Sequence, residues 1–386
     1  MSPYANFLYF GVLLYLVVPT IALGLLGRAN RLWMLVCTLL AAGLHFSGHI
    51  PVDRAWTLPE GCFALGFLCY EGLLTAAFLR WKSRATFHAS VVLAILPLAL
   101  AKFLPLFAPH SAAGFLGISY VTFRALDVIF SIQDGIIKSL RLTEYFTFLF
   151  FFPTVSSGPI DRYRRFLQDW NRTRTRTEFL ADLDLCVDRL FRGFAYKFLL
   201  AALIKTHWLD RAEAAHGLLH GLSYMYAYTF YLFFDFAGYS AFAVGIAHLF
   251  GVRVGENFSR PFLAHNIRDF WNRWHISLSF WFRDHVYMRF LLAAAKGKWF
   301  KGKHTSSYLG LFLTFGLMGI WHGPHAHYML YGLYHAALLS GYDWFARWNK
   351  EHKRFPDGPG WRVFDTALTF HSVAFGLLLF SGHLTK

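Results

Sequence analysis

Long apolar segments recur from one end of this chain to the other, and they constrain its fold more than any other feature. Hydrophobic residues make up 56% of the 386 residues, whereas charged residues make up 15%. Length alone would suggest two or three soluble domains. Apolar runs long enough to cross a bilayer overrule that estimate. The sequence therefore predicts an all-α polytopic membrane protein, folded as a single transmembrane domain over residues 1–386.

The distribution of basic residues between the apolar runs predicts the topology. Residues 1–27 contain no Lys or Arg, and Arg28 and Arg31 follow the first apolar run. Because basic residues gather in cytoplasmic loops, the N-terminus is predicted to lie outside the cell. Continued along the chain, the pattern gives about ten crossings. Segments 145–157 and 268–295 have basic residues on both sides, so we expect them to be re-entrant or to lie in the membrane plane.

The formal net charge of +15 belongs to the loops. A nucleic-acid interface needs a basic face on a folded soluble domain, and here the basic residues are scattered, so no nucleic-acid partner is expected. Anionic lipids and an acidic cytoplasmic protein are the expected partners. Four cysteines stand singly and form no CxxC pair, which favours buried free thiols over metal or disulfide roles: Cys37, Cys62, Cys69 and Cys186.

One stretch, 268–284, combines aromatic and polar residues at helical spacing: RDFWNRWHISLSFWFRD. In a helix, Asn272, His275 and Ser279 share one stripe, because steps of three and four residues return to the same face. Such a helix suits the wall of an apolar cavity in which a few polar groups meet a substrate. The alternative is a helix in the membrane interface, with tryptophans at headgroup depth. The apolar stripe holds Trp271, Trp274, Leu278 and Trp281.

A histidine, His322, ends a later apolar segment within the sequence GLMGIWHGPH. Ionisable residues at membrane depth are costly, which makes this one a candidate functional residue. A histidine hydrogen-bonded to a neighbouring helix is the structural alternative. His325 and His327 follow closely, but Pro324 interrupts the backbone and the motif contains no carboxylate. No metal site is therefore predicted.

Other charged residues also fall inside apolar segments. Asp235, in YLFFDFAGYS, is either an orienting partner for a histidine or a substrate amine, or a structural acid that is protonated or paired. Arg124 and Asp127 stand three residues apart in the fifth apolar segment, a spacing that favours a structural ion pair.

Five motifs occur between residues 156 and 323: SSGPIDRYRRF at 156–166, FFDFAGYS at 233–240, ENFSRPF at 256–262, NRWHISLSFWFRD at 272–284 and WHG at 321–323. In sequence and order they resemble the membrane-bound O-acyltransferase (MBOAT) superfamily, and within it the branch that transfers D-alanine in teichoic acid modification. The resemblance implies about ten transmembrane helices plus re-entrant helices around a central funnel and tunnel. Residues 1–114 would be peripheral helices, and 115–386 the core that bears the motifs.

The resemblance also implies the roles of two histidines. His322 occupies the position of the catalytic histidine, and His275 its paired position. An imidazole with a pKa near 6.5 can take a proton from an attacking hydroxyl and return it to a departing thiol. We expect His322 to be the general base. His275 would polarise a thioester carbonyl or orient the acceptor, with Asn272 as a candidate oxyanion donor.

Further residues are predicted to line the substrate tunnel: Trp271, Asn272, Trp274, Ser279, Asp235 and Trp321. A basic run that follows the apolar FLLAAA at 290–295 would suit docking of an acidic carrier protein, and would equally suit contact with anionic lipid. Its members are Lys296, Lys298, Lys301 and Lys303.

The activity implied by the resemblance is D-alanine transfer at a bacterial cell membrane. A D-alanyl carrier protein would deliver the amino acid as a phosphopantetheine thioester, and a hydroxyl from the outer side would receive it for (lipo)teichoic acid D-alanylation. Accessory membrane proteins would serve the acceptor side, and no tightly bound cofactor is expected. O-acetylation of an extracellular polysaccharide, as in alginate modification, is the alternative within the superfamily. A transporter with coupling residues at Asp235 and Arg124 is the alternative of a different class.

Overall fold

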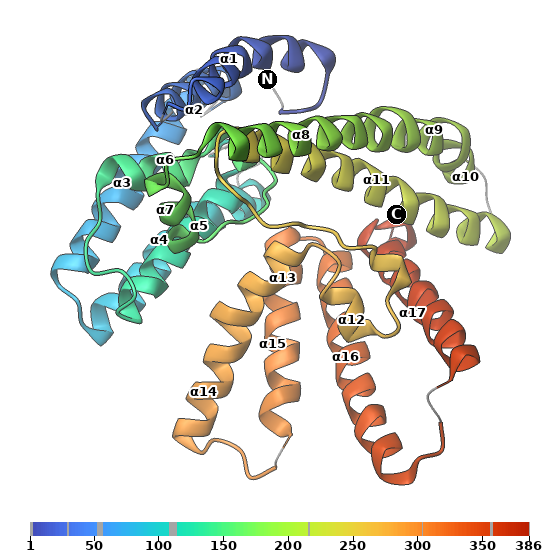
Figure 1. The fold of residues 1–386 in the computed structure, drawn as a ribbon. Helices are drawn as coiled ribbons and strands as arrows, with labels where there is room; N and C mark the ends of the chain where they lie inside the picture. Colours follow the sequence, from blue (N-terminus) through green and yellow to red (C-terminus); the bar gives the residue numbers. More distant parts are fainter. Residues whose placement is uncertain are drawn as a thin grey trace. The chain divides into compact units, whose positions relative to one another are not determined.

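A computed structural model of the chain describes residues 3–28, 31–51, 57–107, 114–214, 217–302, 304–355 and 358–385. Helices form almost all of the regular structure in these ranges (Figure 1). The strands found there are the antiparallel pair β1 (His49–Pro51) and β2 (Thr57–Pro59), in which Ile50 lies opposite Leu58. The prediction of a helical fold is confirmed.

The chain divides into two compact units. The first consists of Met1–Gly193 with Tyr239–Gly255, and the second of Phe194–Gly238 with Glu256–Lys386. His275 and His322 both belong to the second unit. The prediction of one transmembrane domain concerns how the whole chain folds in a membrane, and it stays a prediction.

The first unit is built from helices, and the first of them begins at a capping residue. Asn6 caps the first helix, because its side-chain oxygen accepts a hydrogen bond from the backbone N–H of Tyr9 at 3.0 Å. Helices α3, α4 and α5 lie side by side (Figure 1). The elements are α1 (Phe7–Leu25), α2 (Arg31–His45), α3 (Glu60–Arg80), α4 (Arg84–Phe107), α5 (Ile118–Gln133), α6 (Leu142–Phe150), η1 (Phe152–Thr154), α7 (Tyr163–Asn171) and α8 (Arg176–Gly193), with the last part of α11 (Leu218–Leu249).

The multi-pass membrane character rests on length and composition. Five helices in the described part of the chain are long and apolar enough to cross a membrane: α1, α3, α4, α11 and α17 (Pro359–Phe380). The segment 145–157 contains no such helix, because α6 ends at Phe150 and Pro153 lies in the short turn η1. The break near Pro153 was predicted from the sequence. The count of about ten crossings stays a prediction.

Arg124 of α5 is fully buried and holds the end of α6. Its guanidinium donates to the carbonyl oxygens of Phe148 at 3.1 Å, Leu149 at 3.0 Å and Thr154 at 2.8 Å, and also to the Thr154 hydroxyl. Carbonyls at the end of a helix have no partner within it. One buried side chain therefore satisfies several acceptors where the chain turns.

The predicted ion pair between Arg124 and Asp127 is wrong. Asp127 accepts instead from the side chain of Arg162 at 2.8 Å and from the backbone N–H of Tyr163 at 3.1 Å. The turn after α6 offers the Arg124 guanidinium several carbonyls, and a sequence spacing of three residues gives no sign of that turn.

The expectation of buried thiols holds for two of the four cysteines. Cys37 and Cys186 are buried, whereas Cys62 and Cys69 of α3 are exposed, and all four are free. Cys62 and Cys69 stand seven residues apart, so they share the outer face of one helix. An apolar segment in a membrane protein need not be buried in protein, which is why composition misled here.

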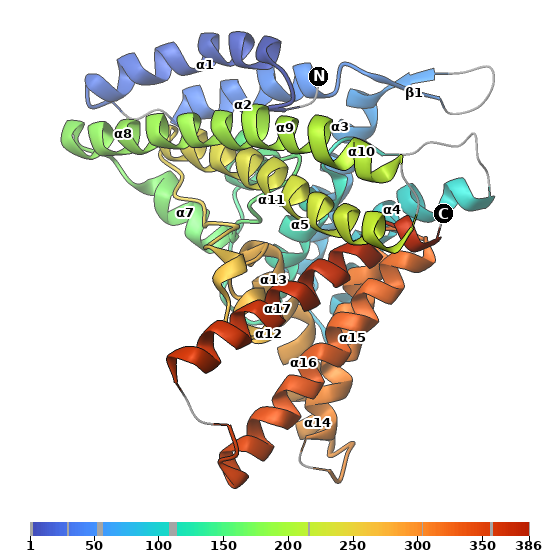
Figure 2. The same cartoon turned by 90° about the vertical axis from the view of Figure 1, so that its right-hand side faces the viewer.

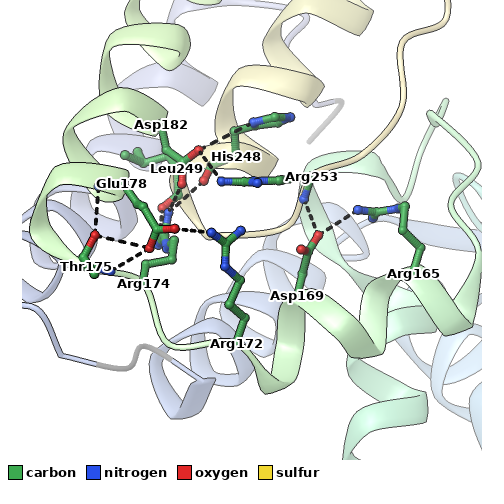
Figure 3. A network of polar contacts seen from close by, with 10 residues as sticks. All are labelled: Arg165, Asp169, Arg172, Arg174, Thr175, Glu178, Asp182, His248, Leu249 and Arg253. Atoms are coloured by element: carbon green, nitrogen blue, oxygen red, sulfur yellow. Dashed lines mark hydrogen bonds and ion pairs between the residues drawn. The ribbon is translucent and has the colours of Figure 1, made fainter.

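A polar network in the first unit joins the chain before α8 to the end of α11 (Figure 3). Arg174 donates to the Asp182 carboxylate at 2.9 Å, and to the backbone carbonyls of His248 and Leu249 at 3.0 Å each. Burial opposes ionisation of Asp182, but hydrogen bonding from His248 and Arg174 and the charge of Arg253 outweigh it and hold the pKa of this carboxyl below its usual range. The network thus caps α11 with a paired charge.

The second unit carries the candidate site. Helices α15, α16 and α17 lie beside one another (Figure 2). The elements are η2 (Phe194–Ala201), α9 (Ala202–Ile204), η3 (Lys205–Leu209), α10 (Asp210–Glu213), the first part of α11, η4 (Pro261–Leu263), α12 (Ile267–Trp271), α13 (Ile276–Phe282), η5 (Arg283–Tyr287), α14 (Met288–Gly297), α15 (Thr305–His322), α16 (Ala326–His352), α17 and η6 (His383–Thr385).

Two glycines allow α15 and α16 to pack backbone against backbone. A Cβ added to Gly332 would lie 2.2 Å from the carbonyl oxygen of Phe315, and one added to Gly319 would lie 2.5 Å from that of Tyr328. Neither distance is compatible with a side chain. This close approach fixes the end of α15, which carries His322, against the first turns of α16.

We expect Arg124→Leu to destabilise the protein by about 3 kcal/mol or more, because several buried carbonyls lose their donor. Arg124→Lys should recover only part of this, since an ammonium cannot donate in a fixed fork. Thermal unfolding midpoints in detergent would measure both. Arg141→Leu is the control, because that side chain is 79% exposed in its pair with Glu144 and should matter little. Equal midpoints for the Arg124 and Arg141 variants would contradict this account.

Asp182→Asn should lower the unfolding midpoint at neutral pH and matter progressively less in acid. The pKa of Asp182 is depressed in the folded state. The stabilisation from its charge is therefore present above the unfolded pKa of about 3.9 and is lost as the pH falls through the folded value. Unfolding midpoints of both proteins between pH 7 and pH 3 test this. A gap between the two curves that widens in acid would reverse the sign of the effect.

Candidate functional site

The stretch 268–284 is interrupted and does not form the single helix that its spacing suggested. Helix α12 ends at Trp271, α13 begins at Ile276, and η5 follows from Arg283. At the break, His275 has φ 43° and ψ 50°, in the left-handed region. Non-glycine residues adopt this conformation rarely, and surrounding contacts must hold it. The prediction of one continuous stripe through Asn272, His275 and Ser279 is therefore wrong.

Residues 257–259 stabilise this break through main-chain hydrogen bonds to the residues on either side of His275. The backbone N–H of Ser259 donates to the carbonyl of Arg273 at 3.0 Å, and that of Ile276 donates to the carbonyl of Asn257 at 3.0 Å. Phe258 and Trp274 face each other as an isolated antiparallel bridge. These main-chain bonds replace those that a helix would have made across the break.

Asn257 is a residue that the sequence analysis did not single out. It is fully buried, and its side-chain oxygen accepts a hydrogen bond from the Ser277 hydroxyl at 2.6 Å. It therefore ties the break to the first turn of α13 by both its main chain and its side chain. The only sequence signal was its place in the ENFSRPF motif.

His275 is directed into an aromatic cluster. Its side chain is 6% exposed, and its ring meets that of Phe236 of α11 edge to face at 4.8 Å. Burial among these rings favours the neutral imidazole, because a charge is costly to remove from water. Trp274 lies in the same cluster, stacked on Phe270 and in contact with Phe258.

A cavity of about 320 Å³ lies in the second unit, within the range of small-molecule sites. Trp271, Asn272 and Ser279 contribute to its wall, so three of the predicted tunnel residues share one space. Apolar side chains form much of the remainder, among them Leu311, Phe315, Met318 and Leu339. The charged members are Arg268, Arg283 and Asp343, and Arg268 pairs with Asp343 at 2.7 Å.

His322 lies at the end of α15 in a cage of rings from three helices. Its ring centroid is 4.4 Å from that of Trp321, 4.8 Å from Phe380 of α17 and 6.2 Å from Tyr331 of α16. Met318, which lines the cavity, stands four residues before His322 on the same helix. One helical turn, about 6 Å along the axis, therefore separates the cavity wall from the imidazole.

The remaining predicted site residues are placed apart from the cavity wall. Asp235 of α11 forms an ion pair with Lys197 of η2, so its charged partner among the described residues is a lysine. His325 and His327 stack at 5.5 Å, and no group of three or more potential metal ligands occurs among the residues that the structure describes.

The predicted docking lysines follow one another at the end of α14. Lys296, Lys298 and Lys301 are exposed, and Lys298 ends the helix with φ 51°. Lys303 lies outside the described residues. Large apolar side chains are exposed in the same stretch, including Leu292 at 66% and Trp299 at 56%. The stretch thus combines positive charge with apolar surface.

A buried histidine that the sequence analysis did not single out lies close to the cavity wall. His335 of α16 is 1% exposed, and its ring contacts Trp271 at 5.1 Å and Tyr331 at 4.6 Å. It stands four residues after Tyr331 and four before Leu339, on one face of α16. An isolated histidine in an apolar helix was the available signal.

Comparison with known proteins identifies the family. The pattern of MBOAT, the membrane-bound O-acyltransferase family, matches residues 130–380. A teichoic acid D-alanyltransferase of Bacillus subtilis is 42% identical over 99% of this chain and 98% of its own length, and one of Lacticaseibacillus rhamnosus is 40% identical over 100% and 98%. A probable alginate O-acetylase of Pseudomonas syringae is 34% identical over 58% of this chain and 42% of its own length. The chain belongs to the membrane-bound O-acyltransferase family.

Proposed function

We propose that this protein is a teichoic acid D-alanyltransferase. It takes D-alanine from a phosphopantetheine thioester on a carrier protein and passes it across the bacterial cell membrane to a hydroxyl acceptor. The observation that carries this proposal is similarity over essentially the whole chain to two teichoic acid D-alanyltransferases. The similarity to alginate O-acetylases spans 58% of the chain, so polysaccharide O-acetylation is the weaker alternative.

The proposal includes the finer architecture of the family. The chain forms one transmembrane domain of about ten helices with re-entrant segments around a funnel and tunnel, and its N-terminus lies outside the cell. Five helices long and apolar enough to cross a membrane support this arrangement. The basic loops at Arg28 and Arg31 and at Lys296 and Lys298 would then face the cytoplasm.

The cavity is the proposed site for the donor arm. It has charged residues, Arg268, Arg283 and Asp343, as well as an apolar part that includes Met318. Arg268 and Arg283 begin and end a segment flanked by cytoplasmic charge, so an arm entering from the cytoplasm would pass them first. Met318 stands one turn before His322. The thioester at the tip of the arm would thus be carried toward the imidazole.

His322 is the proposed general base. The oxygen of the acceptor hydroxyl attacks the thioester carbonyl carbon while its proton passes to the imidazole. The tetrahedral intermediate then collapses, the carbon–sulfur bond breaks, and the imidazole returns the proton to the departing sulfur. A new ester and a free pantetheine thiol result, and the enzyme regains its starting protonation state. The aromatic cage around His322 supports this role, because packed rings restrict the orientation of the imidazole.

His275 is the proposed second catalytic histidine. Its imidazole is buried, which favours the neutral form, and its Nδ1 has no hydrogen-bond partner among the described residues. A neutral imidazole of this kind can donate to a developing oxyanion or orient the acceptor. Asn272, which lines the cavity, is a second candidate donor. The left-handed turn at His275 sets where this ring points.

No tightly bound cofactor is part of the proposal, because the phosphopantetheine arrives with the acidic D-alanyl carrier protein. The exposed lysines at the end of α14, with Leu292 and Trp299 beside them, are the proposed docking surface. Accessory membrane proteins of the same pathway would supply the acceptor, and anionic lipids would surround the basic loops.

His322→Ala should lower D-alanine transfer by about 10²- to 10⁴-fold, the usual contribution of a general acid–base residue. His275→Ala should also lower it, with a smaller effect if the ring only orients the acceptor. Transfer of radiolabelled D-alanine from the loaded carrier protein to the membrane acceptor would measure both. His352→Ala, at the end of α16, is the control and should transfer normally. Undiminished transfer by a well-folded His322→Ala protein would reject the assigned base.

Reversing the charge of Lys296, Lys298 and Lys301 to Glu should raise the KM for the carrier protein about tenfold or more at low salt, because like charges then oppose docking. The difference from wild type should shrink as salt is added. The turnover rate at saturating carrier should stay close to that of wild type. Reversal of Lys350, Lys353 and Arg354 to Glu, in another exposed basic stretch, provides the matched control. An equal effect of both sets would indicate general attraction in place of a docking surface.

A further inference from the structure

We propose that Trp271 and His335 form a polar subsite that binds a secondary amide of the donor arm on its way to His322. This inference rests on the proposed function, since phosphopantetheine contains two such amides. It assigns a substrate contact to His335 and a specific atom, the indole N–H, to Trp271.

The location of the two rings follows from the order of residues along two antiparallel helices. On α15, the cavity-lining residues Phe315 and Met318 precede His322. On α16, Tyr331 comes first, then His335, and then the cavity-lining Leu339. His335 therefore stands one turn beyond the cavity wall, on the side of Tyr331, whose ring contacts that of His322. In the proposed path, a group that moves from the cavity toward His322 passes His335.

Both side chains carry a buried polar atom whose hydrogen-bonding capacity is unused. In the described part of the chain, neither the Trp271 Nε1 nor the His335 Nδ1 has a hydrogen-bond partner. Trp271 is 7% exposed and His335 is 1% exposed. Their rings are in contact, with centroids 5.1 Å apart and planes at 87°. Buried polar groups are nearly always paired in folded proteins, so two unpaired ones in contact point to a ligand.

The chemistry of the two atoms selects the ligand. An indole N–H can only donate, whereas a neutral imidazole with its proton on Nε2 accepts at Nδ1. A group that satisfies both must accept and donate within a few ångströms, as a secondary amide does through its carbonyl oxygen and its N–H. An amide that loses its water among apolar side chains is costly to bury without hydrogen-bond partners, so an arm in this region would require such a subsite. Phe315, Met318 and Leu339 supply such surroundings.

The backbone around His335 is shaped to accept this ring. A Cβ added to Gly376 of α17 would lie 2.5 Å from the His335 Nε2. Phe315 faces the ring from α15 at 6.4 Å. The imidazole is thus held by contacts from α12, α15, α16 and α17. Such fixed orientation is what a hydrogen-bonding subsite requires.

The experiment compares carrier proteins loaded with natural and altered arms. In the altered arms, each amide in turn is replaced by –CO–CH2–, which removes the N–H, or by –CH2–CH2–, which removes both polar groups. For wild type, we expect kcat/KM for D-alanine transfer to fall about tenfold for the hydrocarbon replacement at one of the two amides. In Trp271→Phe, the same replacement should cost only about twofold, because the carbonyl contact is already lost.

Variants of His335 test the other half of the subsite. His335→Leu should remove the penalty for losing the amide N–H, whereas His335→Asn should retain it, since its side-chain oxygen can accept in place of Nδ1. Trp344→Phe, at an exposed indole of α16 that does not line the cavity, is the matched control. It should show the wild-type penalties. Each penalty is a ratio of kcat/KM values for two arms measured on the same protein, so a lower amount of folded enzyme does not change it.

The outcomes separate the subsite from the proposed function. If wild type does not transfer D-alanine from the naturally loaded carrier, the proposed function falls and takes the subsite with it. If wild type transfers but discriminates less than about twofold at both amides, the subsite is overturned while the function stands. Penalties that are the same in wild type, Trp271→Phe and His335→Leu would also overturn it, because the unpaired atoms would then serve only water or packing.

Discussion

The close packing of α15 on α16 is the contact on which the rest of the second unit depends. Gly319 and Gly332 let the two backbones approach within a distance that no side chain would permit. That approach fixes His322, at the end of one helix, against Tyr331 of the other. It also places Phe315 beside His335. One part of the cavity wall and the candidate base therefore belong to the same closely packed pair of helices.

Polar groups in this unit follow a pattern expected of a protein in a membrane. Charged residues at the cavity are paired, as with Arg268 and Asp343. The deeper polar groups are side chains that can be neutral, such as His275 and His335, each surrounded by rings. Burying a neutral imidazole costs far less than burying a charge. Proton transfer at a histidine is thus compatible with an apolar site, whereas a buried carboxylate base would need a partner.

The sequence predicted the helical class and the motifs because both depend on local features. Hydropathy identifies α1, α3, α4, α11 and α17 from their own residues. The break at Pro153 was also local, since proline cannot continue a helix. Within the candidate site, the sequence singled out Trp271, Asn272 and Ser279, which share a cavity. His275 and His322 both lie within the region that matches the family, and their catalytic roles stay proposals.

Composition and spacing determined by themselves that this chain is a multi-pass, largely helical membrane protein with aromatic and histidine-bearing motifs in its second half. The tertiary structure alone decided how those motifs are shaped. Spacing favoured one helix through His275, but hydrogen bonds from residues 257–259 hold the chain open there. Arg124 bonds to carbonyls some 25 residues away and not to Asp127. His335 meets Trp271 from a distant helix. Each outcome depends on partners remote in sequence, which local periodicity does not encode.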